Sequence, residues 1–289
     1  MPCSSWLSLA QGVEEILVAA NLRGMQSLRQ ALPQGYLARA AEQLLNVQGS
    51  VLIGTGFPVL ATFETDGPAG AIALYRYLEK QGSVAPTLVC GEPLFGKLQA
   101  DFSCLELPLD AIADAEAYSR EQLALWQPQL VVSIERPGLA ADNRYYNMRG
   151  EDISQRCGCF DYFMRLASCP TIAIGDGGNE IGMGNVYQAL AQLPITPSVT
   201  TVDELVIADV SNWAAYALVM LCCAARQQRW QDHLPLKDIF TYLSAHGSVD
   251  GVSRRNEHSE DNQPLEVTFK LLEQLDTLIR QYDSSVSVQ

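Results

Sequence analysis

The segment "TIAIGDGGNEIGMG" (171–184) decides the fold, because an apolar run stops abruptly in a loop rich in glycine. The run shows no polar alternation, so it predicts a strand covered on both faces, as in a parallel sheet. The loop that follows holds five glycines and two carboxylates, Asp176 and Glu180. Because glycine lets the backbone approach a small ligand closely, we expect a binding loop at the end of this strand.

Similar apolar runs recur along the chain, with helical patterns between them. The other predicted strands are "VLIGTGF" (51–57), "PTLVCG" (86–91), "CLELPL" (104–109), "QLVVSIE" (129–135) and "DELVIADV" (203–210). Helical patterns cover 67–82, 114–127 and 212–230. This alternation predicts an α/β fold of three layers, a mainly parallel sheet with helices on both faces.

The two ends of the chain add helices to this core. Residues 1–50 repeat apolar side chains at helical spacing, and "PLEVTFKLLEQLDTLIRQY" (264–282) is an amphipathic helix. Since no linker, repeat or low-complexity tract interrupts the pattern, we expect a single domain over 1–289. It comprises a helical segment (1–50) and an α/β core with a C-terminal helix (51–289).

Composition excludes several classes of partner. The 289 residues are 48% apolar and 18% charged, which is enough to bury a substantial core. A net charge of −14 disfavours nucleic acid and anionic membranes as partners. The first ten residues resemble no targeting peptide, so we expect a cytoplasmic protein with its eight cysteines as free thiols. Homo-oligomerisation stays open.

Charged and amide residues follow four of the predicted strands. In an open parallel sheet the ligand crevice lies beyond the carboxyl ends of the strands, so these residues should converge. They are Glu64 and Asp66; Arg136, Asn147 and Arg149; Asp176, Asn179 and Glu180; and Asp209, Ser211 and Asn212. Asp250, between two turn glycines, is a fifth candidate.

A purely structural role would also account for two of the acids. Short carboxylates before glycine often cap helices or close turns, which suits Asp66 and Asp176 equally well. A capping box, however, needs an acid at the third position after the cap, where Asn179 stands. Helix capping therefore leaves Glu180 unexplained.

Converging acids would repel one another unless a positive group lay between them. A divalent cation (Mg, Mn or Ca) held by oxygen ligands is a common solution. The expected ligands are Asp66, Asp176, Glu180 and Glu64. No nucleotide cofactor is expected, because the glycine loop lacks the dinucleotide-binding spacing and no Lys-Ser or Lys-Thr pair follows it.

Taken together, several motifs resemble the D-glutamate cyclase family. The matching pieces are "GFPV" (56–59), "ETDGPAGAIAL" (64–74), "NRYYNMRGEDIS" (143–154), "IGDGGNEIGMGNV" (174–186), "VSNWAAYAL" (210–218) and "VDGVSRRN" (249–256). They occur in family order from about residue 50 onward. Two segments depart from the family pattern, "RPGLAADNRYYN" (136–147) and "EDNQP" (260–264), and both are expected at the outer rim of the pocket.

The resemblance implies a lyase that closes D-glutamate to 5-oxo-D-proline with loss of water, and it suggests an acidic pocket that binds a divalent metal. We expect Arg136 and Arg149 to grip substrate carboxylates. Asp176, Glu180 and Asp66 would hold the metal or a shared proton. The expected substrate-binding residues are Gly177, Gly178, Asn179, Asn147, Tyr146, Ser211, Asn212 and Asp250.

Two alternatives from other functional classes remain open on the sequence. A metal-dependent hydrolase of a small phosphorylated or amide metabolite would use the same acids. A non-catalytic amino-acid-binding protein would bind such a ligand without changing it.

Overall fold

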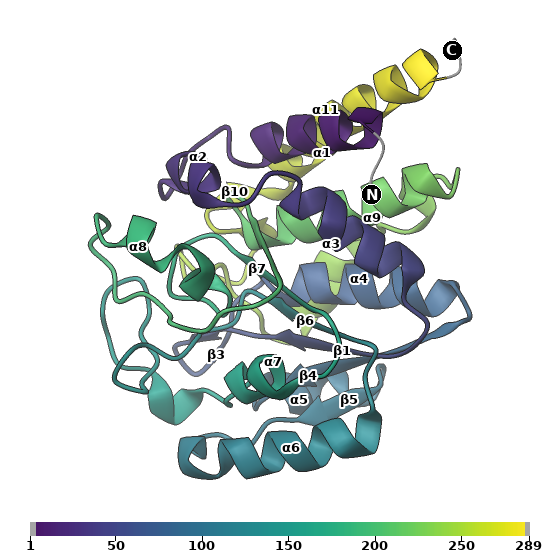
Figure 1. The fold of residues 1–289 in the computed structure, drawn as a ribbon. Coiled ribbons are helices and arrows are strands. Elements are labelled where there is room, and N and C mark those ends of the chain that lie inside the picture. The colour runs from purple at the N-terminus through teal and green to yellow at the C-terminus, as the bar shows by residue number, and fades with distance from the viewer. Residues whose placement is uncertain (1–3, 287–289) are drawn as a thin grey trace.

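A sheet of six parallel strands forms the centre of the molecule in the computed structural model, which describes residues 4–286 (Figure 1). The strand order is β5-β4-β1-β6-β7-β8. The strands are β1 (Gly49–Thr55), β4 (Val84–Cys90), β5 (Cys104–Glu106), β6 (Leu130–Ile134), β7 (Thr171–Gly175) and β8 (Glu204–Ile207). All six coincide with predicted apolar runs, and the strands β6, β7 and β8 are buried along their whole length.

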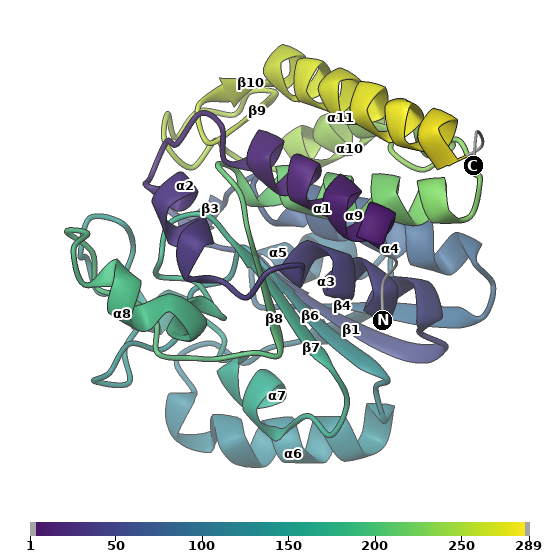
Figure 2. The same ribbon diagram turned by 45° about the horizontal axis from the view of Figure 1, so that its top comes forward.

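Helices cover both faces of the sheet, which confirms the three-layer α/β prediction (Figures 1 and 2). One face carries α6 (Ala115–Trp126) and α7 (Asp161–Leu166). The opposite face carries α3 (Tyr36–Asn46), α4 (Pro68–Lys80) and α9 (Ser211–Ala225).

An outer set of helices packs on α3, α4 and α9 (Figure 2). It consists of α1 (Ser4–Leu17), α10 (Leu236–Ala245) and α11 (Leu265–Val286). One continuous hydrophobic core contains side chains from α1, α3, the sheet, α9 and α11. The predicted helical additions at both ends are therefore part of the same core.

The remaining elements are short. They are α2 (Met25–Leu28), α5 (Leu94–Leu98), α8 (Tyr187–Leu190), the hairpin β2 (Pro58–Val59) and β3 (Thr62–Phe63), the hairpin β9 (Ser259–Glu260) and β10 (Gln263–Pro264), and five 3-10 turns in the described chain.

The predicted helix over 212–230 is too long. It ends at Ala225, where the backbone N–H of Arg226 donates to the carbonyls of Cys222 and Cys223. Gln227 then takes a left-handed conformation (φ 55°). The physical reason is burial: α9 is enclosed through Cys223, and the polar residues after Ala225 have no place in such a core.

Two further sequence expectations can be compared with the structure. The seven cysteines that the structure describes are all free thiols, five of them buried, and Cys3 lies outside the described residues. Between residues 4 and 286, no helix combines the length and apolarity needed to cross a bilayer.

The strand order reverses between β1 and β6, and this reversal positions the site. The chain winds outward from β1 through β4 and β5, and returns to the other side of β1 through β6, β7 and β8. Loops at the carboxyl ends of β1 and β6 must therefore turn in opposite directions, which opens a crevice between them.

Candidate functional site

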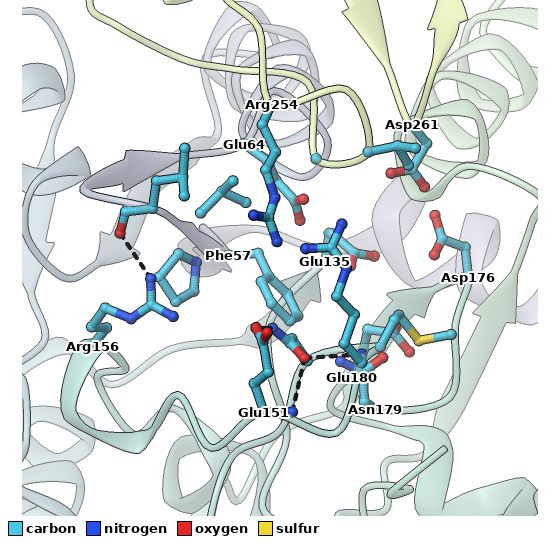
Figure 3. A pocket seen from close by; sticks show the side chains of 18 of the residues that line it. Phe57, Glu64, Glu135, Glu151, Arg156, Asp176, Asn179, Glu180, Arg254 and Asp261 are labelled. Carbon is cyan, nitrogen blue, oxygen red and sulfur yellow. Dashed lines mark hydrogen bonds between the residues drawn. The ribbon is translucent and has the colours of Figure 1, made fainter. Parts of the chain in front are cut away.

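A cavity of about 270 Å³ opens at this reversal, above the carboxyl ends of the strands (Figure 3). This is slightly below the roughly 300–1,000 Å³ of pockets for drug-sized ligands, and so suits a small metabolite. Its charged lining residues are six acids (Glu64, Glu135, Glu151, Asp176, Glu180 and Asp261) and four arginines (Arg23, Arg149, Arg156 and Arg254). Phe57, Leu60, Met148 and Val252 contribute apolar surface.

Asp66 and Asn212 join the N-termini of α4 and α9 by capping each other's helix. The Asn212 Oδ1 atom accepts from the N–H groups of Gly67 (2.9 Å) and Gly70 (2.7 Å) at the start of α4. The Asp66 carboxylate accepts from the N–H groups of Ser211 (3.1 Å) and Asn212 (2.8 Å) at the start of α9. Both helices therefore direct their positive dipole ends at the acids.

Glu260 fixes the orientation of the Asn212 amide. Its Oε2 atom accepts from Asn212 Nδ2 at 2.7 Å, and its Oε1 atom accepts from Trp213 Nε1 at 3.0 Å. Burial raises the pKa of Glu260 to about 7, although these hydrogen bonds oppose the shift. Asp66, Ser211 and Asn212 lie directly behind the cavity wall rather than on its surface.

Three buried carboxylates from separate strands meet at the floor. One oxygen each of Asp66, Glu135 and Asp176 lies within 4.8 Å of the others. Ser211 links them, because its N–H donates to Asp176 Oδ2 (3.0 Å) as well as to Asp66, and its hydroxyl donates to Glu135 Oε2 (2.6 Å). Glu135 itself adopts φ 45°, a left-handed conformation that is uncommon outside glycine and occurs at functional sites.

Burial raises the pKa of every acid in this floor. The carboxyl groups of Asp66, Glu135 and Asp176 all have pKa values well above the ordinary range, because burial disfavours their charge and neighbouring carboxylates repel it. Burial and the charges of Asp261, Asp66 and Asp176 likewise raise the pKa of Glu64. Each of these carboxyl groups therefore binds a proton more readily than an exposed acid does.

Arg23 provides a positive charge inside the site. Its guanidinium forms ion pairs with Asp176 and Asp261, and the two carboxylates raise the pKa of Arg23 against the effect of burial. The turn that carries Arg23 is anchored by Asp209, whose buried carboxylate accepts from the N–H groups of Ala20 (2.8 Å), Asn21 (3.0 Å) and Leu22 (2.9 Å). The end of β8 thus holds the N-terminal segment over the floor.

Asp261 reaches Arg23 from a tight hairpin turn. It stands with Asn262 between β9 and β10, and both adopt positive φ (51° and 60°), as a type I′ turn requires. Burial and the charge of Asp176 raise the pKa of Asp261 to about 8.

The backbone of the glycine loop contacts the Glu180 carboxylate rather than the cavity. The N–H of Gly178 donates to Glu180 Oε2 at 2.7 Å, and a Cβ on Gly177 would lie 2.7 Å from Glu180 Oε1. Gly178 also has φ 108° and lies against Ile195. Gly177 and Gly178 do not line the cavity, so the predicted close approach exists, but it is between the loop backbone and its own carboxylate.

Asn179 faces the cavity with an unsatisfied oxygen. Its Nδ2 donates to the carbonyl of Tyr146 at 2.8 Å, while its buried Oδ1 has no hydrogen-bond partner within the described chain. An unpaired buried oxygen costs about 1–3 kcal/mol, so a donor that reached it would be favoured.

The structure places other predicted residues outside the cavity. Arg136 is buried beneath it, where its guanidinium donates to the carbonyls of Thr55 (2.6 Å) and Gly158 (2.5 Å). Tyr146 donates its hydroxyl to Asp142 (2.7 Å) and is absent from the lining. Asp250 closes a turn with both of its carboxylate oxygens.

The prediction that Arg136 grips a substrate carboxylate is therefore corrected by its geometry, since both terminal nitrogens already bind backbone. By contrast, Arg149 and Asn147 do reach the rim of the cavity. Asn147 shapes that rim, because its Oδ1 accepts from the N–H groups of Arg149 (2.9 Å) and Glu151 (3.1 Å).

Sequence reasoning assigned no role to six of the charged lining residues, namely Arg23, Glu135, Glu151, Arg156, Arg254 and Asp261. Glu135 ends a predicted strand and carried the same signal as Asp176. Arg23 carried no local signal, because it lies 153 positions from the aspartate it pairs with. The carboxylate triplet that the structure assembles therefore contains Glu135 in place of the expected Glu180 and Glu64.

The fold and the cavity define a doubly wound α/β protein with an acidic cavity at the reversal of its sheet. Within that class, a family model described as "D-glutamate cyclase-like, C-terminal" matches residues 13–276. The chain belongs to this family.

Two known proteins are similar to the chain. A Homo sapiens protein named "D-glutamate cyclase, mitochondrial" is 31% identical over 236 residues. The match covers 71% of this chain and 38% of that protein, so the chain spans well under half the length of this relative. A solved exopolyphosphatase-related protein from Bacteroides fragilis has a TM-score of 0.41 at 8% identity, covering 85% of this chain and 57% of that one.

Proposed function

We propose that the cavity cyclises D-glutamate to 5-oxo-D-proline with loss of water. The observation that carries this proposal is a floor of buried carboxylates with raised pKa values beneath a rim of arginines, in a chain of the D-glutamate cyclase-like family. D-glutamate has matching chemistry, with one ammonium group and two carboxylates. Folding it so that the amine meets the γ-carboxyl carbon brings the two reacting groups to the floor and leaves the α-carboxylate near the rim.

The reaction needs no nucleophile from the protein, because the substrate's own amine attacks. Holding the amine near the γ-carboxyl carbon supplies an effective-molarity advantage of up to about 7–11 kcal/mol. Asn179 supports this orientation, since it belongs to the cavity lining and its buried, unpaired Oδ1 suits an ammonium or amine hydrogen.

Two protons must also leave the nitrogen and two must reach the departing oxygen, and the floor offers one group to accept protons and one to donate them. The ion pair with Arg23 favours the charged form of Asp176, which suits it to accept a proton from the ammonium group. Glu135 has no cation partner in the described residues and is surrounded by other acids, which suits it to hold a proton. It would donate this proton to the γ-carboxyl oxygen. Once the ring has closed, the second nitrogen proton would pass to Glu135, and Asp176 would return its own proton to the same oxygen, which leaves as water.

A divalent cation fits the same floor. Oxygens of Asp66, Glu135 and Asp176 lie within 4.8 Å of one another, and two oxygens on opposite sides of a Ca²⁺ ion would be roughly 4.6–5.2 Å apart. When bound, such an ion would neutralise the carboxylates and polarise the γ-carboxyl group. These three residues would be its ligands, with Arg23 as the competing cation.

The direct test is proton NMR of purified protein incubated with D-glutamate or L-glutamate, with and without EDTA. We expect 5-oxoproline to accumulate from D-glutamate faster than in the enzyme-free control. Hydrolysis of a phosphorylated or amide metabolite, with no action on glutamate, would instead support the hydrolase alternative. Full activity in EDTA would remove the metal from the mechanism.

Variants of the floor test the assigned roles. We expect E135Q and D176N each to lower kcat by about 10²-fold or more, as is usual for loss of an acid or base. E14Q is a matched control, because Glu14 is a buried acid with a raised pKa on α1, outside the cavity lining. If E135Q and D176N fold and retain the kcat of E14Q, the floor is not the catalytic site.

A further inference from the structure

Arg254 extends from the loop before β9 into the cavity (Figure 3). Within residues 4–286, its guanidinium forms no hydrogen bond or ion pair. The adjacent Arg255 points elsewhere and pairs with Glu257 (3.1 Å). Two neighbouring residues of one type thus have different environments, and of these two only Arg254 offers a free cation to the cavity.

The turn that carries Arg254 is rigidly built. Asp250 Oδ1 accepts from the N–H groups of Val252 (2.9 Å) and Ser253 (2.7 Å), and the N–H of Arg254 donates to the Asp250 carbonyl (2.8 Å). The second carboxylate oxygen of Asp250 accepts from Ser259 Oγ (2.7 Å) and the Asn262 N–H (2.7 Å). Asp250 therefore fixes the turn against the hairpin that carries Asp261.

This construction holds Arg254 in a left-handed backbone conformation (φ 59°). Such a conformation is costly outside glycine and persists only where the surrounding contacts enforce it. The turn also packs closely against the acidic wall, so closely that a Cβ on Gly251 would lie 2.1 Å from Glu64 Oε2. The base of the Arg254 side chain therefore has a fixed position relative to the floor.

The other cavity arginines differ in whether their guanidinium groups already have a partner. Arg23 is paired with Asp176 and Asp261, and Arg156 donates to the Leu60 carbonyl at 2.8 Å. The Arg149 guanidinium, like that of Arg254, has no partner in the described part of the chain. Both side chains are exposed, but the turn of Arg254 is closed by the buried Asp250, whereas the turn of Arg149 is closed by the partly exposed Asn147.

We propose that Arg254 is a specificity-determining residue that binds the non-reacting α-carboxylate of the substrate. The inference rests on the proposed function. A guanidinium stabilises an ionised carboxylate and cannot supply a proton, so it would oppose neutralisation of the γ-carboxyl group. It suits the carboxylate that stays charged throughout the reaction, while the acidic floor takes the γ-carboxyl group.

Binding to R254M, R254K and the matched control R255M tests this assignment. Isothermal titration calorimetry would measure Kd for glutarate, which has two carboxylates and no amine, and for 4-aminobutyrate, which lacks the α-carboxylate. We expect R254M to weaken glutarate binding at least tenfold, R254K to restore part of it, and R255M to match the wild type. Binding of 4-aminobutyrate should change less than twofold in all three variants.

Kinetics with D-glutamate supply a second readout. R254M should raise KM at least tenfold, with a smaller change in kcat. Equal glutarate affinities for R254M and R255M would overturn the inference, as would an equal loss of glutarate and 4-aminobutyrate binding, or a wild type that binds neither. A wild type that binds glutarate in the Arg254-dependent way but forms no 5-oxoproline would refute the proposed function and leave the assignment of Arg254 intact.

Discussion

Replacing Arg23 by methionine should destabilise the protein strongly, and more so at high pH. The side chains of Asp176 and Asp261, its two partners, are only 3% and 8% exposed, so water cannot replace the lost cation. Removing one partner of a buried ion pair costs about 3–5 kcal/mol. We expect a loss of this size in the free energy of unfolding of R23M near pH 8.5.

The sign of the pH dependence follows from Asp261. Its pKa in the folded protein is about 8, above the ordinary 3.8, so its contribution to stability is present at low pH and declines as the pH rises through 8. Arg23 opposes this rise in pKa, and its removal lets Asp176 and Asp261 retain protons to higher pH. The loss in R23M should therefore be smaller near pH 6, by at least about 1 kcal/mol.

Urea unfolding of R23M, D261N and the double variant at both pH values measures the effect. D261N should recover part of the R23M loss near pH 8.5, with a coupling energy of about 1–3 kcal/mol, because it removes one of the two unpaired carboxylates. R120M is the control, since Arg120 forms an exposed ion pair with Glu116 and should cost less than about 0.5 kcal/mol. A cost for R23M that equals that of R120M at both pH values would refute this reasoning.

Three further predictions concern the surroundings of the floor. The pKa of Glu260 is about 7 in the folded protein, against an ordinary 4.5. The free energy of unfolding of the wild type should therefore fall as the pH rises between these values, by at most about 3 kcal/mol. E260Q should reduce this pH dependence in urea unfolding. G251A should lower kcat/KM at least about tenfold by displacing Glu64. G96A is the control and should leave kcat/KM unchanged, because its Cβ would meet only the flexible end of Glu92. Equal activities of the two variants would exclude a role for the position of Glu64. D209A should cost about 1–3 kcal/mol and speed amide hydrogen exchange in the turn after α1, and unchanged exchange there would contradict the anchoring role of Asp209.

The sheet could be predicted from the sequence because each buried parallel strand is a short apolar run, and such a run indicates burial on both faces without reference to any distant segment. The rule that ligands bind beyond the carboxyl ends of such strands then selected Glu64, Asp176, Asn179 and Glu180, all of which line the cavity. These successes depend on local patterns combined with one general property of the fold.

The remaining parts of the site depend on contacts between distant segments. Arg23 enters the floor because Asp209 anchors its turn, and neither residue carries a pattern that reveals the other. Asn212 has a residue type that suits a ligand site, yet its amide oxygen caps α4 and its amide nitrogen donates to Glu260. Sequence identifies polar residues near the crevice, but only packing decides which of them remain available to a ligand.

On this acidic floor the substrate's own amine should displace a γ-carboxyl oxygen as water. The most direct measurement is mass spectrometry of 5-oxoproline formed by the wild type from D-glutamate that carries ¹⁸O in both γ-carboxyl oxygens. We predict product above the enzyme-free control that retains one of the two labels, the other leaving as water. No product above that control, or product that has lost both labels to the solvent, would contradict the claim.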